Sequence, residues 1–229
     1  KGKMSKRKGH VSAQSFLDRG YLPEALLNFF MILGWAREDE VEIMTLEEYV
    51  QLFDPKDVSP SSVVFDTKKL NWINGMYIRK LTPEQLSEKI TPFLPTDFPT
   101  QKQNDILPLI HERLETLADI EQLTTFFYRD ITVDSQLLLK KSTPEEVKAQ
   151  LEATIGVLQA IQSENWSVAA IETAIRELAE KNDWKPGQYF MMLRIAATGN
   201  KATPPLFDTL FVIGSELLVE RLQAASKLA

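Results

Sequence analysis

The feature that most constrains the fold of this 229-residue chain is a pair of complete helix start signals. Residues 82–85 read Thr-Pro-Glu-Gln, and residues 143–146 read Thr-Pro-Glu-Glu. Each pattern places threonine at the N-cap, proline at the first helical position and an acceptor side chain at the third, which is the capping-box arrangement. After the second signal, apolar residues recur every three or four positions from Val147 to Ile161, so one face of that helix is expected in a core.

Helical patterns account for most of the remaining chain. We expect helices at residues 23–34, 67–79, 83–93, 101–119, 144–163, 168–181, 187–198, 204–213 and 216–225. Gly199-Asn200 is the expected stop of one helix, and Thr203-Pro204 the start of the next. Short extended pieces are expected only at 39–45 and 62–65, and a loop at 54–62. The sequence therefore predicts a mainly all-α protein.

Composition excludes several classes of function. The absence of cysteine and the presence of only two histidines, His10 and His111, leave almost no material for a zinc site or a histidine-based relay, so no metal is expected. No apolar run reaches the roughly 18 residues of a membrane span, so no membrane contact is expected. The absence of cysteine fits a reducing, cytoplasmic protein. The net charge of −6 argues against indiscriminate nucleic-acid binding, although local basic patches remain compatible with a structured RNA.

The chain opens with a lysine-rich segment in which residues 3–7 read KMSKR. Lysines on a glycine-flanked loop can stabilise the charge that develops on a leaving pyrophosphate. A solvated tail or a localisation signal would have the same local composition. The interpretation of this segment therefore depends on the residues that follow it.

Three later blocks complete a family pattern. Residues 21–35 run from Tyr-Leu-Pro-Glu to Leu-Gly-Trp, residues 65–79 read FDTKKLNWINGMYIR, and residues 198–214 contain Thr-Pro-Pro-Leu-Phe. In this order, and together with KMSKR, they resemble the bacterial glutamyl-tRNA synthetases, which are class I aminoacyl-tRNA synthetases. The resemblance covers the chain from the KMSKR motif to its C-terminus and implies the C-terminal half of such an enzyme.

The resemblance implies a domain organisation. Residues 1–80 would form the end of the catalytic domain and a helical stem-contact fold. Residues 81–126 and 127–229 would form two subdomains of an α-helical anticodon-binding cage. The stem-contact fold would touch the inner corner of the L-shaped tRNA, and the cage its anticodon.

The resemblance also implies a reaction. The parent enzyme activates glutamate with ATP and transfers it to tRNA(Glu), with Mg²⁺ present in the full-length enzyme. The second class I signature, a His-Ile-Gly-His-like element, is absent, so this half is expected to bind no cofactor and not to aminoacylate alone. We expect a monomer that binds tRNA and not DNA. Lys3 and Lys6 match the catalytic lysines, and Lys3, Ser5, Lys6 and Arg7 the contacts to the ATP phosphates.

Ten residues are expected to contact tRNA, and four of them belong to helix 67–79, for which Asp66 is the expected N-cap. The ten residues are Lys68, Lys69, Asn74, Arg79, Arg113, Arg176, Arg194, Thr203, Pro204 and Leu206. On helix 67–79, cations, amides and phenols are groups that contact RNA phosphate and ribose. The alternative is that Trp72 and Tyr77 are core aromatics and the lysines a solvated face; for Trp72 we favour the core.

For each of the three arginines outside that helix, contact with tRNA has to be weighed against a different role within the protein. Arg113 matches the position at which discriminating enzymes read the third anticodon base and prefer C over G. The guanidinium is a rigid fork of donors, which suits the acceptor atoms of cytosine. The alternative is that Arg113 is an exposed arginine near two glutamates. Arg176 lies four residues after Glu172, so its alternative role is a helical ion pair with that residue, worth about 0.3 kcal/mol. Arg194 has no acidic residue three or four positions away, so it needs a partner from elsewhere, and RNA would serve.

Other interpretations stay open. A non-discriminating synthetase that also charges tRNA(Gln) would share most of these residues. A non-catalytic tRNA-binding or helical scaffold protein related to the cage is an alternative of a different class. The class I lysyl-tRNA synthetase also has a helical cage, but the block at 65–79 looks more like the glutamyl family. The glutaminyl enzyme fits less well, because its anticodon region is built of β-barrels.

Overall fold

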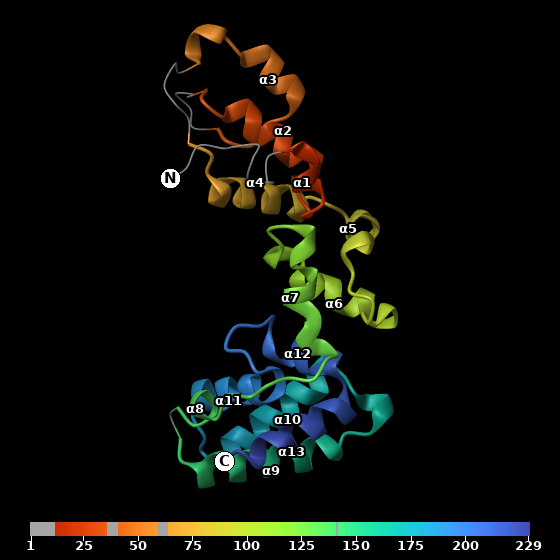
Figure 1. Ribbon diagram of the computed structural model, residues 1–229. Coiled ribbons are helices and arrows are strands. Elements are labelled where there is room, and N and C mark those ends of the chain that lie inside the picture. Colours follow the sequence, from red (N-terminus) through yellow and green to blue (C-terminus); the bar gives the residue numbers. More distant parts are fainter. Residues whose placement is uncertain (1–11, 36–40, 59–63, 141) are drawn as a thin grey trace. The chain divides into compact units, whose positions relative to one another are not determined.

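The computed structural model of the chain describes residues 12–35, 41–58, 64–140 and 142–229 (Figure 1). It divides into two compact units. The first consists of residues 1–97 and 110–123, and the second of residues 98–109 and 124–229. Each unit is described by itself below.

Helices make up both units. The α-helices in the described residues are α1 (Ala13–Leu17), α2 (Pro23–Ile32), α3 (Leu46–Leu52), α4 (Thr67–Arg79), α5 (Pro83–Ile90), α6 (Gln103–Ile110), α7 (Ile120–Thr124), α8 (Ser135–Leu138), α9 (Pro144–Gln159), α10 (Val168–Lys181), α11 (Pro186–Thr198), α12 (Leu206–Ile213) and α13 (Ser215–Ser226). Short 3-10 turns occupy Pro55–Asp57, Thr91–Phe93, Thr100–Lys102, His111–Arg113, Leu117–Asp119, Thr125–Phe127 and Ser163–Asn165. The prediction of a mainly all-α protein is confirmed.

The expected extended pieces do not form strands in the residues that the structure describes. Residues 41–45 and 64–65 are irregular. Within the described ranges, the one isolated β-bridge joins Trp35 to Val58. The carbonyl of Glu42 and the N–H of Met44 instead bond to the buried amide of Asn28, at 2.9 and 3.1 Å. A side chain therefore satisfies backbone groups that a ladder would otherwise pair.

The first unit is built on the packing of α2 against α4. Helix α4 begins where expected, because a carboxylate oxygen of Asp66 accepts the N–H groups of Lys68 and Lys69 at 2.9 and 3.2 Å. Phe65, just before the cap, packs edge-on against Phe29 of α2 with ring centroids 4.9 Å apart. The two helices therefore share an aromatic core at this end.

A buried amide joins three segments of the first unit. Asn74 of α4 is fully buried. Its Oδ1 accepts the N–H of Leu22 at 2.8 Å, and its Nδ2 donates to the carbonyl of Glu115 at 2.6 Å. Beside it, the N–H of Leu117 donates to the carbonyl of Gly20 at 2.9 Å. Gly20 has φ +81°, and a Cβ there would lie 2.5 Å from the backbone nitrogen of Ala118, so only glycine allows this approach.

The single helix expected over 101–119 is wrong, because the chain breaks there into α6 and 3-10 turns. Leu114 is extended, with ψ 120°. One carboxylate oxygen of Asp119 accepts the N–H groups of Glu115 and Thr116 at 3.0 and 2.7 Å, which starts a new helical turn. Pro108 inside α6 also lacks a backbone donor. The apolar spacing survives the break, since Leu114 and Leu117 are both buried.

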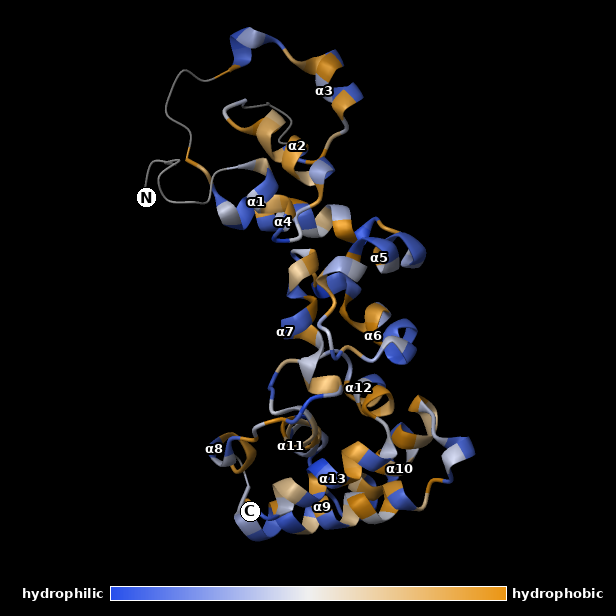
Figure 2. Ribbon diagram, turned by 45° about the vertical axis from the view of Figure 1, so that its right-hand side comes forward, coloured by the Kyte–Doolittle hydropathy of each residue, from blue (hydrophilic) through white to orange (hydrophobic). Residues whose placement is uncertain are grey.

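The second unit is a bundle in which α9 packs on α13 and α10, and α11 on α13. Figure 2 shows hydrophobic and hydrophilic residues alternating along α9, as expected for an amphipathic helix. Its predicted capping box is present, with Thr143 and Glu146 bonded to each other's backbone N–H. Helix α9 ends at Gln159, four residues before the expected end. Helix α11 ends at the expected stop, because Gly199 takes the left-handed φ of +70°.

A buried arginine fixes the interior of this bundle. Arg221 of α13 is 5% exposed. Its Nη1 donates to the carbonyls of Phe126 and Ala197 at 2.7 and 2.8 Å, and its Nη2 to the carbonyl of Arg129 at 2.7 Å. One guanidinium therefore satisfies three carbonyls, two from the segment 126–129 and one from α11.

Candidate nucleic-acid interface

The opening motif lies outside the described residues. Lys3, Ser5, Lys6 and Arg7 therefore keep the ATP-related roles assigned from sequence only as predictions. In the part of the chain that the structure describes, no group of three or more His, Asp or Glu side chains could hold a metal ion. No described helix is long and apolar enough to cross a membrane.

In the second unit, Arg176 of α10 lies over two aromatic rings. Its guanidinium carbon is 5.3 Å from the centroid of Phe190 on α11 and 5.3 Å from that of Phe207 on α12. The two rings meet edge to face, with centroids 5.5 Å apart. The Nε of Arg176 also donates to Glu172 at 2.7 Å, as expected from the spacing, yet its side chain stays 56% exposed. A cation over aromatic rings next to solvent is a surface on which a nucleic-acid base can stack.

Arg194 of α11 finds its partners within the protein. Its Nη1 donates to the Thr203 hydroxyl and to the carbonyl of Pro204, the latter at 2.7 Å. The partner that Arg194 was expected to need from elsewhere is therefore supplied by residues 203–204, and its assignment as a tRNA contact stays a prediction. The same contacts explain why Thr203-Pro204 is not the start of a helix: both residues are buried against Arg194, and α12 begins at Leu206.

The structure thus brings together the predicted residues of the second unit. Helices α10, α11 and α12 pack against one another. Arg176 reaches the rings of α11 and α12, while Arg194 holds the segment that leads into α12. Phe190 and Phe207 were missed from sequence. Their positions in the sequence could have indicated them, since Phe190 lies one helical turn before Arg194 and Phe207 follows Leu206.

In the first unit, the predicted residues of α4 have separate surroundings. Lys68 is exposed. The Nζ of Lys69 lies 2.6 Å from a carboxylate oxygen of Glu42. Arg79 donates from Nη1 to the carbonyl of Glu112 at 3.3 Å. Asn74 has no exposed surface and uses its amide within the protein, so it is withdrawn as a tRNA contact.

The two aromatic residues of α4 have different surroundings. Trp72 is 44% exposed, so the expectation that it is a core residue is wrong. The hydroxyl of Tyr77 lies 2.9 Å from the Oδ1 of Asn28 and 3.1 Å from the carbonyl of Met44. Tyr77 therefore has the structural role that was its alternative.

Arg113 ends the 3-10 turn His111–Arg113, which packs against α4. The ring nitrogen Nε2 of His111 lies 2.8 Å from the carbonyl of Ile78, which fixes the turn on the helix. Arg113 itself is exposed. Its assignment as the reader of the third anticodon base stays a prediction.

Two family models match the chain. Residues 85–226 match the anticodon binding domain, and residues 1–72 match the catalytic domain of class I tRNA synthetases (E and Q). The class of protein is therefore defined: a helical anticodon-binding domain that follows the end of a class I tRNA-synthetase catalytic domain. The expected boundary after residue 80 falls in the gap between the two matches, and the division at residue 126 stays a prediction.

The relatives narrow the class to one family. Glutamate–tRNA ligases from Chloroflexus aurantiacus and Roseiflexus castenholzii are 39% and 40% identical to this chain over 98% of its length. Solved glutamate–tRNA ligase structures from Elizabethkingia meningosepticum and Elizabethkingia anophelis superpose with TM-scores of 0.80 and 0.81 at 26% identity, over 99% of this chain. The chain belongs to the bacterial glutamate–tRNA ligase family. It spans 47% and 46% of the two sequence relatives, and 49% and 48% of the two structures.

Proposed function

We propose that this chain is the tRNA-binding half of a cytoplasmic glutamate–tRNA ligase and recognises the inner corner and anticodon of tRNA(Glu). The observation that carries the proposal is the cluster of Arg176, Phe190 and Phe207 beside the segment held by Arg194. It lies within the residues that match the anticodon binding domain.

The cluster suits unpaired bases better than a duplex. Single-stranded RNA is recognised by stacking splayed bases on aromatic or guanidinium planes and by bonding to their edges. Arg176 and the two rings supply the stacking surface. Arg194 holds the buried residues 203–204, which lead into α12, so Phe207 is already in place when a base arrives.

The proposed parent reaction divides between this chain and an upstream half. Lys3 and Lys6 would stabilise the phosphate charge of ATP, with Ser5 and Arg7 as further contacts, and Mg²⁺ would act in the full-length enzyme. Arg113 would prefer C over G at the third anticodon position. This half would supply specificity and would not activate glutamate alone.

The test is binding of tRNA(Glu) by this chain and by its Phe207→Leu variant, measured by fluorescence anisotropy. Loss of one base–aromatic stack is expected to weaken binding about 5- to 150-fold. Lys148→Gln, which removes an exposed cation from α9 in the same unit, is the matched control and should change affinity about twofold or less. Equal affinities for wild type and Phe207→Leu, or no binding by the wild type, would contradict the proposal.

A further inference from the structure

The C-terminal end of α12 is held by side chains from two other segments of the second unit. The Nζ of Lys102 donates to the carbonyls of Val212 and Ile213 at 2.8 and 3.0 Å. The indole Nε1 of Trp166 donates to the carbonyl of Phe211 at 3.2 Å. The last carbonyls of an α-helix have no partner within the helix, so these two side chains satisfy three of them in succession.

The ammonium of Lys102 suits this place better than a neutral donor would. A helix C-terminus carries a partial negative charge, so a cation stabilises it, most strongly where the two are partly buried. Lys102 is half-buried, and desolvation lowers its pKa, because the ammonium has given up water to reach the carbonyls. The two carbonyls replace part of that water.

The contact with two successive carbonyls fixes the orientation of α12. Successive residues of an α-helix are turned by about 100° about its axis. A donor that binds the carbonyls of Val212 and Ile213 together therefore fixes the rotation of the helix as well as its place along the axis. Phe207 lies five residues before Val212, about 8 Å along the axis, so Lys102 acts on this ring through the helix.

Lys102 comes from a segment that is itself fixed on the second unit. It ends the 3-10 turn Thr100–Lys102, within the segment 98–109 that belongs to this unit. Phe98, which is 7% exposed, meets the ring of Tyr128 edge to face with centroids 5.7 Å apart. The ammonium is therefore carried by an anchored turn, and it can hold α12 in one position.

The two ends of α12 are held by cations from different segments. Arg194 of α11 holds residues 203–204 ahead of the helix, and Lys102 holds the carbonyls at its end. The helix has only eight residues, and isolated helices of fewer than about 12 residues are marginal in water. Its orientation therefore depends on these contacts at its ends and on its packing.

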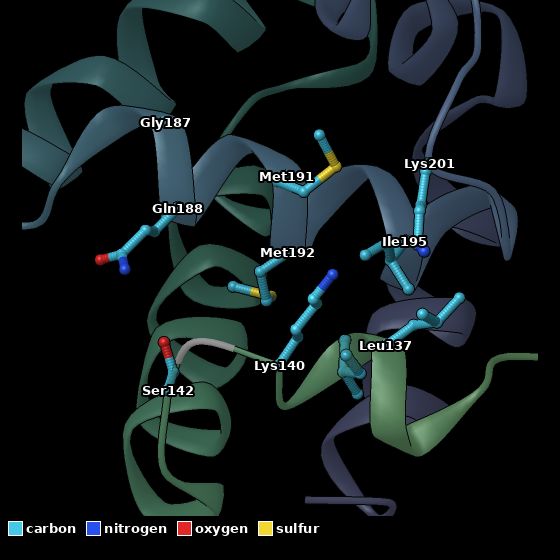
Figure 3. A pocket seen from close by; sticks show the side chains of 10 residues that line it. Leu137, Lys140, Ser142, Gly187, Gln188, Met191, Met192, Ile195 and Lys201 are labelled. Atoms are coloured by element: carbon cyan, nitrogen blue, oxygen red, sulfur yellow. The ribbon is translucent and has the colours of Figure 1, made fainter.

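The effect of Lys102 does not pass through the cavity on the other side of α11. That helix carries Phe190 on one face and, with α8, lines a cavity of about 220 Å³ on another (Figure 3). Neither Lys102 nor any residue of α12 lines this cavity. Lys102 and the cavity can therefore be tested separately.

We propose that Lys102 is a positioning residue for tRNA binding, which holds α12 so that the Phe207 ring is in place to stack with an unpaired base. The inference rests on the proposed function, which places a base on the stacking surface of Arg176, Phe190 and Phe207. Lys102 itself contacts neither base nor phosphate. Without it, binding would have to order the Phe207 ring, at a cost in affinity.

A double-mutant cycle of Lys102→Met and Phe207→Leu tests the proposal, with tRNA(Glu) binding measured by fluorescence anisotropy. Methionine keeps much of the apolar stem and removes the charge and the donors. Lys102→Met alone should weaken binding about 3- to 10-fold, the cost of ordering one side chain on binding. In the Phe207→Leu background the same change should alter affinity by less than about twofold, because the ring through which Lys102 acts is gone.

The salt dependence of binding separates positioning from direct contact. A lysine that neutralises a phosphate of single-stranded RNA contributes about 0.7 to the slope of log affinity against log salt. Lys102→Met should leave that slope unchanged, because the Nζ is bound to carbonyls of the protein. Lys148→Met, which removes an exposed lysine from α9, is the matched control and should change affinity about twofold or less in both backgrounds.

Trp166→Phe probes the same end of α12 with a milder change. It removes the donor to the carbonyl of Phe211 and keeps an aromatic ring. Any loss of affinity that it causes should likewise disappear in the Phe207→Leu background. Circular dichroism checks that each variant folds, and if Lys102→Met does not fold, the cycle with Trp166→Phe decides by the same criteria.

The outcomes separate this inference from the proposed function. If the wild type binds no tRNA, or Phe207→Leu binds as well as the wild type, the proposed function fails and the inference fails with it. If Phe207→Leu weakens binding and folded Lys102→Met does not, the inference fails and the proposed function stands. If Lys102→Met weakens binding by the same factor in both backgrounds, or lowers the salt slope, Lys102 acts independently of Phe207 and the inference is overturned.

Discussion

At the scale of single residues, the amide of Asn74 shows how much one polar side chain can hold in place. It pairs the N–H of Leu22 and the carbonyl of Glu115, groups that lie 52 and 41 positions away in sequence. Without it, the buried N–H of Leu22 and the half-buried carbonyl of Glu115 would lose their partner. The cost of that loss is the basis of a stability prediction.

Asn74→Ala is expected to lower the free energy of unfolding by about 2 kcal/mol or more, since each buried group left unpaired costs about 1–3 kcal/mol. Urea denaturation followed by circular dichroism measures the change. Asn71→Ala on the same helix is the control, because its bonds to Tyr21 and Glu115 are partly exposed, and a loss of about 1 kcal/mol is expected. Equal losses in the two variants would refute the structural role given to Asn74.

The arginines show where residue-level prediction from sequence ends. Arg113, Arg194 and Arg221 all lie beside apolar helical faces, and local spacing cannot distinguish them. In the structure, Arg113 is exposed, Arg194 bonds to residues 203–204, and Arg221 bonds to carbonyls 24 to 95 positions away. Arg176 has a local partner, Glu172, and that contact was predicted. Long-range partners depend on the packing of whole helices.

At the scale of elements, start and stop signals were the most reliable guide. The capping boxes at 82–85 and 143–146 and the cap at Asp66 are all present. Helix α3 was missed although Thr45 and Glu48 form the same kind of box. The prediction of one helix over 101–119 failed for the opposite reason. Its apolar spacing was correct, but the carboxylate of Asp119 accepts two backbone N–H groups that a continued helix would have used. Spacing predicts which face is buried, and caps decide where a helix ends.

Two glycines of the second unit test these helix boundaries. Gly199→Ala is expected to lower the free energy of unfolding by more than about 1 kcal/mol, because its φ is +70° and a Cβ would lie 2.6 Å from the carbonyl oxygen of Thr132. Gly156→Ala, inside α9 with open space around it, should raise the same quantity by about 0.5–1 kcal/mol. Thermal unfolding of the two variants gives the comparison. Stabilisation by Gly199→Ala would contradict the left-handed helix stop.

At the scale of the whole molecule, an acidic chain can bind RNA if its cations act locally. Lys68 on α4, Arg113 on the adjoining turn, and Arg176 on α10 are all exposed, while the chain carries a net charge of −6. Such a surface disfavours indiscriminate binding and leaves selectivity to the stacking surface and to particular arginines. The two-unit division was not predicted from sequence, because it follows contacts that place residues 98–109 and 110–123 in different units.

The central claim, that this chain reads the anticodon of tRNA(Glu), is tested most directly by competition binding. Labelled tRNA(Glu) is bound to the chain and displaced by unlabelled glutamate, glutamine or aspartate tRNA. We predict that glutamate tRNA competes best, and that Arg113→Gln narrows its advantage over glutamine tRNA, which has G at the third anticodon position. Equal competition by all three tRNAs for the wild-type chain would contradict the claim.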